Sequence, residues 1–251
     1  MTASIDVAFT PADVRRTDVA LVVDVLRASS TIVTALAAGF ERVLCVGDVE
    51  GARALSGPGR ALAGERGCQP IEGFDHGNSP SEFQHASVAE LVLCTTNGTP
   101  AVLSSGEAAG EVLIASLLNL DAVIGAVPPD ADVTVVCSGT DRRFALEDAY
   151  AAGRLVGRLG RARTDAATAA LRLAGSYADS LKPLDESADA AVLRDTGQSA
   201  DISFCARESV FDIVPRVAEI GEAVAVVEGS SPKDREIPIP HDQTSFDVSR
   251  S

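Results

Sequence analysis

Hydrophobic residues gather in short runs along the chain, and each run is followed by a stretch in which they recur every three or four positions. The runs are ALVVDV (20–25), RVLCVG (42–47), LVLC (91–94), EVLIA (111–115) and VTVVC (133–137). A short apolar run is typical of a buried strand, and the helical period after it predicts a helix that covers the strand. The alternation therefore predicts an α/β protein with a largely parallel or mixed sheet.

The predicted helices follow the runs directly, at 29–39, 48–55, 99–105, 117–127 and 145–159. In the last of them the apolar residues are Leu146, Ala149, Ala152, Val156 and Leu159. Their spacing of three or four places them on one stripe of the helix, which we expect to lie against the sheet.

The C-terminal half departs from this alternation. Residues 164–195 are rich in alanine and predict a helical excursion, in which Pro183 separates two helices. Apolar segments return at 201–215 and 223–229. We expect one α/β domain over residues 1–230, and an extended or disordered tail over 231–251, where proline and polar residues accumulate.

The charge balance limits the possible partners. The chain has 21 lysines and arginines against 36 acidic residues, a net charge of −15. This charge repels nucleic acids and anionic membranes, so an anionic substrate must be bound by individual positive groups. No apolar stretch approaches the roughly 18 residues that span a bilayer, and the N-terminus lacks the apolar core of a signal peptide. We therefore expect a cytoplasmic protein.

Cysteines and histidines give no sign of a zinc site. The five cysteines are scattered, and Cys45, Cys94 and Cys137 fall in strand-like runs, where a thiol acts as a small hydrophobic group. The three histidines lack the spacing of a structural zinc site.

Polar clusters end three of the predicted strands, at 24–30, 94–99 and 137–140. In parallel α/β sheets, ligands bind beyond the carboxyl ends of the strands. We therefore expect these three loops to line one crevice. In the first loop, Asp24 could bind a metal or attack phosphorus, and Arg27 could hold a phosphate by two parallel hydrogen bonds. The alternative is an ordinary helix start with an exposed arginine.

The segment 64–83 brings Glu65, Arg66, Asp75 and Asn78 together with four glycines and two prolines. It is long for a connection, and its acids and arginine suggest ligands of a hard cation beside an anion clamp. The alternative is a solvated loop that turns before Pro80.

In TTNGTPA (95–101), Gly98 permits unusual backbone angles and Pro100 suits the first turn of a helix. The N–H groups of residues 97–99 could then converge on an anion. A structural turn is the alternative.

The fourth cluster, CSGTDRRFALED (137–148), spaces Cys137 and Arg143 as in cysteine phosphatases, although a buried thiol is the competing interpretation. Glu147 and Asp148 could bind a metal or act in acid/base catalysis, or simply stabilise the start of a helix.

Five motifs in these clusters, in their order along the chain, resemble the 2-phosphosulfolactate phosphatase family over about residues 22–159. They are DVLRASST (24–31), GER (64–66), GFDHGNSP (73–80), TTNGT (95–99) and CSGT…FALED (137–148). The resemblance implies a three-layer α/β/α sandwich and a magnesium-dependent phosphatase that converts (R)-2-phospho-3-sulfolactate into sulfolactate, a step toward coenzyme M. Three positions depart from the family pattern: Pro100 stands where a basic residue is expected, His76 replaces an apolar residue, and CSGT replaces CAGT.

The family motifs imply a set of site residues. The catalytic set is Asp24, Arg27, Glu65, Arg66, Asp75 and Cys137. The substrate-binding set is Asn78, Thr96, Asn97, Gly98, Thr99 and Gly139. The Mg²⁺ ligands are Asp24, Glu65, Asp75, Glu147 and Asp148. Two alternatives stay open: a cysteine phosphatase that uses Cys137 and Arg143, and a non-catalytic binder of a phosphorylated or sulfonated metabolite. The expected partner is a small phosphorylated acid, and a homodimer is possible.

Overall fold

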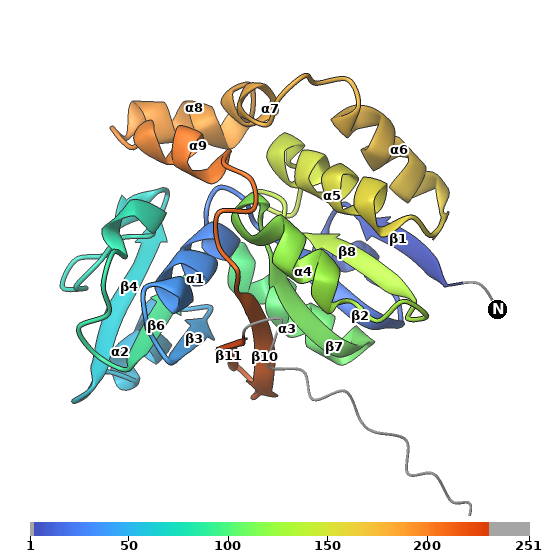
Figure 1. Cartoon of the computed structure of the whole chain (residues 1–251). Coiled ribbons are helices and arrows are strands. Elements are labelled where there is room, and N and C mark those ends of the chain that lie inside the picture. Colours follow the sequence, from blue (N-terminus) through green and yellow to red (C-terminus); the bar gives the residue numbers. More distant parts are fainter. Residues whose placement is uncertain (1–2, 231–251) are drawn as a thin grey trace, which may run out of the picture.

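The computed structural model describes residues 3–230, and the predicted tail lies outside this range. One mixed sheet of eleven strands runs through these residues in the order β5-β4-β6-β3-β11-β10-β7-β2-β8-β1-β9 (Figure 1). The strands are β1 Ser4–Ala8, β2 Thr17–Val23, β3 Arg42–Val46, β4 Arg60–Arg66, β5 Gln69–Pro70, β6 Glu90–Cys94, β7 Ala109–Ala115, β8 Val133–Cys137, β9 Ala162–Arg163, β10 Val214–Ile220 and β11 Val224–Ser230.

The predicted strands form two parallel groups. In one group, β2 pairs with β7 and β8, and β1 pairs with β8. In the other, β6 pairs with β3 and β4. The antiparallel hairpin β10–β11 joins the groups, because β11 pairs with β3 and β10 with β7. The expected α/β fold with a mixed sheet is confirmed.

Helices cover both faces of this sheet. They are α1 Ala28–Ala37, α2 Val49–Ala54, α3 Gly98–Ala108, α4 Leu120–Ala126, α5 Leu146–Leu159, α6 Asp165–Ala174, α7 Leu181–Asp185, α8 Ala188–Asp195 and α9 Ala200–Cys205, with short 3₁₀ helices at Pro11–Asp13, Pro80–Glu82 and Leu117–Asn119. Alternate residues of β2 enter different cores: Leu21 packs with α4, α5 and α6, and Val22 packs with α1 and α3. This alternation produces the three-layer arrangement.

The predicted stripe of α5 is buried where it crosses the sheet. Ala149, Ala152 and Val156 have no exposed surface, and Ala152 and Val156 belong to the core that α4 and α6 complete. The helix ends at Gly160, whose φ of 62° is the left-handed conformation that often terminates helices.

The helical excursion is longer than predicted, because α9 extends it to Cys205. In Figure 1, α6 to α9 form an arc along the top of the molecule, with α8 and α9 above α1. Pro183 lies inside α7 rather than between two helices. A proline is tolerated there because it occupies the first helical turn, where an N–H group has no partner within the helix.

Several strands were missed, among them β1, β4, β5 and β9. We expected Glu65 and Arg66 in a loop, but they are the last residues of β4. The run RALAGER offers only a weak apolar signal, since it contains two alanines and a glycine. Gly64 is required in it, because its φ is 155° and an added Cβ would lie 2.3 Å from the Cys94 carbonyl oxygen. Within residues 3–230, no helix is long and apolar enough to cross a membrane.

Candidate active site

The loops after β2, β4, β6 and β8 meet in a cavity of about 200 Å³, which we call the acidic cavity. Its wall consists of Asp24, Leu26, Arg27, Glu65, Gly67, Cys68, Asn78, Thr95, Thr96, Asn97, Thr140, Asp141, Asp189 and Val192. All three predicted loops contribute to this wall, so the expected crevice is confirmed.

Asp24 follows β2 and is fixed by the start of α1. Its Oδ1 accepts a hydrogen bond from the Ala28 N–H at 3.0 Å, and its carbonyl oxygen accepts one from the Ser29 hydroxyl at 2.8 Å. The residue is only 8% exposed and lines the acidic cavity. These bonds hold the carboxylate at the base of the cavity.

Gly98 allows a second loop to reach Asp24. An added Cβ would lie 2.6 Å from Ala28 Cβ and 3.0 Å from Asp24 Oδ2. The expectation that Gly98 provides unusual backbone angles is wrong, because its φ is not positive. The glycine is needed because α3 begins in close contact with α1.

Asp148 ties two of the strand-end loops together. Its Oδ1 accepts from the Val25 N–H at 2.9 Å, and its Oδ2 accepts from the Gly139 N–H at 3.0 Å. Gly139 has a φ of 63°, and an added Cβ would lie 2.1 Å from the Arg143 carbonyl oxygen. Asp148 and Gly139 therefore hold the backbone behind the cavity, whereas we expected them to contact metal and substrate.

Asp24, Glu147 and Asp148 are buried with no cationic partner among the described residues, so their ionised forms are disfavoured. Burial, followed by the charge of Asp148, raises the pKa of Asp24 well above its usual range. Burial raises the pKa of Asp148 to about 7, although the N–H donors of Val25 and Gly139 lower it. Burial and the charges of Asp148 and Asp189 also raise the pKa of Glu147. A cation near these groups would stabilise their ionised forms.

Glu65 connects β4 to the loop after β6. Its Oε1 accepts from both the N–H and the hydroxyl of Thr96, at 3.1 and 3.0 Å, and its Oε2 accepts from the Cys68 N–H at 3.0 Å. Both oxygens are thus engaged, although the side chain lines the acidic cavity.

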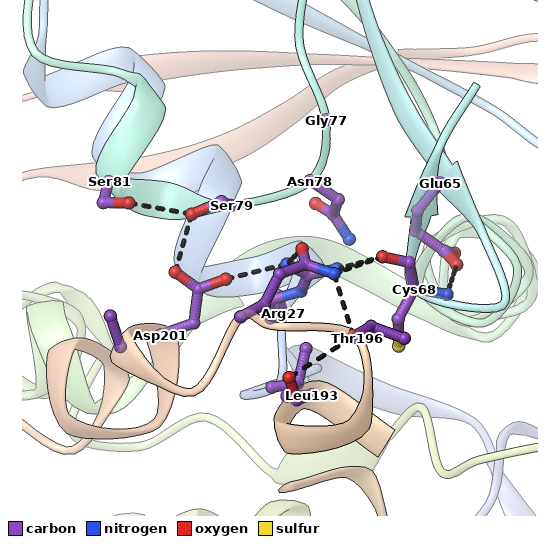
Figure 2. A network of polar contacts seen from close by, with 12 residues as sticks. Arg27, Glu65, Cys68, Gly77, Asn78, Ser79, Ser81, Leu193, Thr196 and Asp201 are labelled. Atoms are coloured by element: carbon purple, nitrogen blue, oxygen red, sulfur yellow. Dashed lines mark hydrogen bonds and ion pairs between the residues drawn. The ribbon is translucent and has the colours of Figure 1, made fainter. Parts of the chain in front are cut away.

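Arg27 is in the cavity wall but already has a partner. Its Nη1 pairs with Asp201 Oδ2 at 2.7 Å, and both side chains are at most 3% exposed. Figure 2 shows Asp201 between Arg27 and Ser79, whose hydroxyl donates to Asp201 Oδ1 at 2.6 Å. Arg27 Nη1 also donates to Gln198 Oε1. The predicted clamp therefore lies at the cavity, but its Nη1 donates to two residues of the helical excursion, Gln198 and Asp201.

Arg66 and Asp75 lie outside the cavity. Arg66 donates to the Gly47 carbonyl at 3.0 Å and to Cys94 Sγ at 3.2 Å. Asp75 is exposed, and its Oδ2 accepts from the Leu62 N–H at 2.8 Å. Neither residue is brought to the place that the motifs implied. Both side chains are used instead to hold backbone around β4.

Cys137 does not have the surroundings of a nucleophile. It is fully buried in the core with α4 and α5, and it is absent from the cavity wall. Burial and the charges of Asp148 and Glu147 raise its pKa well above the usual range, which disfavours the reactive thiolate. Arg143 is exposed and also absent from that wall. The cysteine phosphatase alternative is therefore contradicted.

In the TTNGT loop, some of the groups that we expected to bind an anion already form hydrogen bonds within the protein. The Thr99 N–H donates to Thr95 Oγ1 at 3.3 Å, and the Thr99 hydroxyl donates to the Val46 carbonyl at 3.1 Å. Thr96 and Asn97 line the cavity, and Asn97 Oδ1 accepts from the Asp141 N–H at 3.3 Å. Thr99 is thus structural, while Thr96 and Asn97 face the site.

Asn78 is in the cavity wall with an open polar atom. It is 4% exposed, and its Oδ1 has no hydrogen-bond partner among the described residues. Such buried atoms are rare, so this side-chain amide is suited to contact a bound molecule or an ordered water.

The helical excursion supplies residues that the sequence analysis missed. Asp189 lines the cavity from the first turn of α8, and its Oδ2 accepts from the Thr140 hydroxyl at 2.6 Å. Asp201 and Gln198 hold Arg27, and Gln198 also donates to the Cys68 carbonyl at 2.5 Å. No local motif marks these residues, because their function depends on contacts with loops far away in the chain.

The acids fit a hard cation by their chemistry. Carboxylate oxygens are the preferred ligands of Mg²⁺, and Asp24 and Asp189 offer them at the cavity. As placed, no three His, Cys, Asp or Glu side chains within residues 3–230 form a metal-binding group. The suitability of this cavity for Mg²⁺ therefore rests on two features. Its donors are carboxylate oxygens, and no cation among the described residues pairs with its buried acids.

Comparisons with known proteins show the family to which the chain belongs. The family described as 2-phosphosulpholactate phosphatase matches residues 7–219. A protein of Pseudothermotoga lettingae, described as a probable 2-phosphosulfolactate phosphatase, is 41% identical over 218 residues, which cover 86% of this chain and 96% of the relative. A protein of Thermus thermophilus with the same description is 39% identical over 216 residues, covering 82% and 91%. The chain belongs to the 2-phosphosulfolactate phosphatase family.

Proposed function

We propose that this protein is a Mg²⁺-dependent phosphatase that hydrolyses a small anionic phosphate monoester, (R)-2-phospho-3-sulfolactate, to sulfolactate and phosphate. Membership of the family supports the reaction, and the acidic cavity supports the need for a metal. The proposal includes the step toward coenzyme M that the family resemblance implies. A cytoplasmic location, a homodimer and the absence of nucleic-acid partners stay predictions.

The composition of the cavity wall carries the proposal. Four carboxylates, Asp24, Glu65, Asp141 and Asp189, line it. Among the described wall residues the sole cationic side chain is Arg27, which Asp201 already neutralises. A phosphate dianion would be repelled from such a cavity unless a cation entered with it.

In this proposal Asp24 and Asp189 hold the metal. When bound, the metal neutralises phosphate oxygens and orients the reacting groups. Arg27 stabilises the charge that spreads over the phosphoryl group in a loose transition state. Thr96, Asn97 and Asn78 orient the substrate.

Asp24 is the acid that either attacks phosphorus or accepts a proton from the attacking water. Attack by Asp24 forms an aspartyl phosphate and releases the alcohol, which takes up a proton, and water then transfers the phosphoryl group to itself; attack by water makes phosphate in one step. Only the first route forms a phosphorylated carboxylate. Borohydride reduction of a quenched single turnover would convert such an Asp24 acyl phosphate to homoserine, and mass spectrometry of the peptide that contains Asp24 then distinguishes the two routes.

The proposal is tested by measuring phosphate release from 2-phospho-3-sulfolactate. We expect activity with Mg²⁺, loss of activity in EDTA, and recovery when excess Mg²⁺ is added. In a Cys68→Ser variant, which removes the cysteine that lines the cavity, alkylation of thiols should matter little, because the other four cysteines are buried. Full activity in EDTA would contradict the metal requirement. Tight binding of the ester without any phosphate release would indicate a non-catalytic binder.

A further inference from the structure

A second cavity of about 480 Å³, which we call the side cavity, adjoins the acidic cavity. The two share Thr96, Asn97 and Asp141 in their walls. The remaining wall residues of the side cavity are Thr10, Pro11, Ala12, Pro100, Ser138 and Arg142. Because three residues belong to both walls, the two cavities are direct neighbours.

Ser138 contributes a buried hydroxyl group without a partner. The residue is 3% exposed, and its Oγ makes no hydrogen bond to any described residue. Its backbone is fixed, since the Ser138 N–H donates to the Val23 carbonyl at 2.8 Å. Leaving a buried hydroxyl unpaired is unfavourable, so this group is suited to donate to an oxygen of a bound molecule.

Arg142 contributes a cation to the same wall. It lies in a tight turn in which Thr140 and Arg143 exchange both backbone hydrogen bonds, at 3.0 and 2.9 Å. Asp141 and Arg142 adopt left-handed φ values of 50° and 61°, which are unusual for residues other than glycine. Within residues 3–230, no carboxylate forms an ion pair with Arg142. Strained backbone of this kind is often retained where it positions a functional side chain.

We infer that the side cavity binds a sulfonate group of the substrate while the phosphate occupies the acidic cavity. Arg142 supplies the positive charge, and Ser138 supplies a hydrogen-bond donor. A sulfonate has three acceptor oxygens, so it can accept from both groups at once. The inference rests on the proposed function, because it places the two ends of one phosphate ester in the two cavities. Arg142 thereby selects phosphate esters that carry a further anionic group on C3, in addition to the phosphate and the C1 carboxylate.

Three esters test this selection. They are 2-phospho-3-sulfolactate, 2-phosphomalate, in which a carboxylate replaces the sulfonate, and 2-phospholactate, which lacks that group. For Arg142→Ala we expect kcat/KM to fall about thirtyfold for the sulfonate ester, equivalent to about 2 kcal/mol, and at most about threefold for 2-phospholactate. The phosphomalate ester should fall between them. Arg142→Lys should recover part of the loss.

Arg143→Ala is the matched control, because Arg143 is a neighbouring exposed arginine of the same turn and lines neither cavity. We expect its effect on the sulfonate ester to stay within about twofold. Equal losses for all three esters in Arg142→Ala would overturn the inference, as would equal effects of the two alanine variants on the sulfonate ester.

A binding measurement separates this inference from the proposed function. Sulfolactate and lactate are titrated into the Mg²⁺-loaded protein by calorimetry. We expect the wild type to bind sulfolactate more tightly than lactate, and Arg142→Ala to lose this preference even if no ester is hydrolysed. If the wild type binds sulfolactate no better than lactate, the side cavity is not a sulfonate site.

Ser138→Ala gives a second, independent measurement. If the hydroxyl is a binding group, its removal should weaken sulfolactate binding about fivefold and leave the free protein equally stable or slightly more stable, because an unpaired buried polar atom is lost. A gain in melting temperature with unchanged sulfolactate binding would show that Ser138 plays no part in the site.

Discussion

The two adjoining cavities differ in charge balance although they share part of one wall. Four carboxylates line the acidic cavity, whose one arginine, among the described residues, is neutralised by Asp201. The side cavity has one carboxylate, Asp141, against Arg142. The net charge of −15 therefore says little about either cavity. Within a few ångströms, individual side chains decide whether a metal or an anion is favoured.

The cavities also differ in how they are built. Buried strand ends and the helical excursion position the acids of the first, and bonds such as those of Asp148 to Val25 and Gly139 fix its loops. An exposed turn positions Arg142 in the second. The reaction requires that the reacting groups are placed precisely. Selection among substrates requires only a positive charge near the group that is recognised, and an exposed arginine can supply it. The first cavity thus suits the reaction and the second suits recognition.

The largest expected effect comes from removing one acid of the acidic cavity. Asp24→Asn keeps the shape of the side chain and the oxygen that accepts from the Ala28 N–H. It removes the negative charge with which this side chain is proposed to bind the metal. We expect kcat to fall roughly a thousandfold while the fold is retained. Asp75→Asn is the control, since Asp75 lies outside the cavity, and its activity should stay close to that of the wild type. Comparable losses in both variants would remove the distinction between them.

A smaller effect should follow from adding a methyl group at Gly98, where the loop after β6 contacts the loop after β2. Gly98→Ala places a Cβ against Ala28 and Asp24, so we expect a loss of about 2 kcal/mol in the free energy of unfolding, measured by denaturant titration. Gly125→Ala, at a helical glycine with nothing within 4 Å, should leave stability unchanged or raise it. An unaffected Gly98→Ala would mean that α1 and α3 do not approach as closely as described.

The two predicted arginines should now differ in their effects. Arg27→Lys loses the planar group that binds Asp201, Gln198 and substrate, so kcat/KM should fall about tenfold, on the order of 1.4 kcal/mol. Arg66→Lys should change kcat/KM by at most about twofold, because Arg66 binds backbone outside the cavity. The family motifs placed both arginines in the catalytic set, which implies similar losses for both. Equal losses in kinetic assays of the two variants would restore that earlier interpretation.

The smallest effect should come from adding charge to the side cavity. Pro100 lines this cavity, is exposed and has no charge. Pro100→Arg adds a second cation near Arg142, and we expect the preference for 2-phospho-3-sulfolactate over 2-phospholactate to rise about threefold, from kcat/KM values for both esters. An unchanged preference at low ionic strength would argue against a sulfonate in the side cavity.

Much of the site could be located from sequence because its loops follow recognisable strands. The runs at 91–94 and 133–137 occur as strands within one residue of their predicted ends, and Asp24 and Asn97 were placed correctly at the cavity. Arg66 and Asp75 were not, since both occupy a segment whose weakly apolar strand was read as loop. Asp189 was missed because its only local feature is a place in an alanine-rich helix.

Hydrophobic period and turn residues, which act over a few neighbouring positions, were enough to predict β2, β3, β6, β7 and β8, the helices that follow them, and the polar loops at the ends of β2, β6 and β8. Which polar groups are already satisfied depends instead on contacts in the folded chain. Arg27 and Asp201 are 174 positions apart, yet they form a buried ion pair. Cys137 has the spacing of a nucleophile but lies in the core. Burial and pairing arise from contacts between distant segments, which no local pattern records.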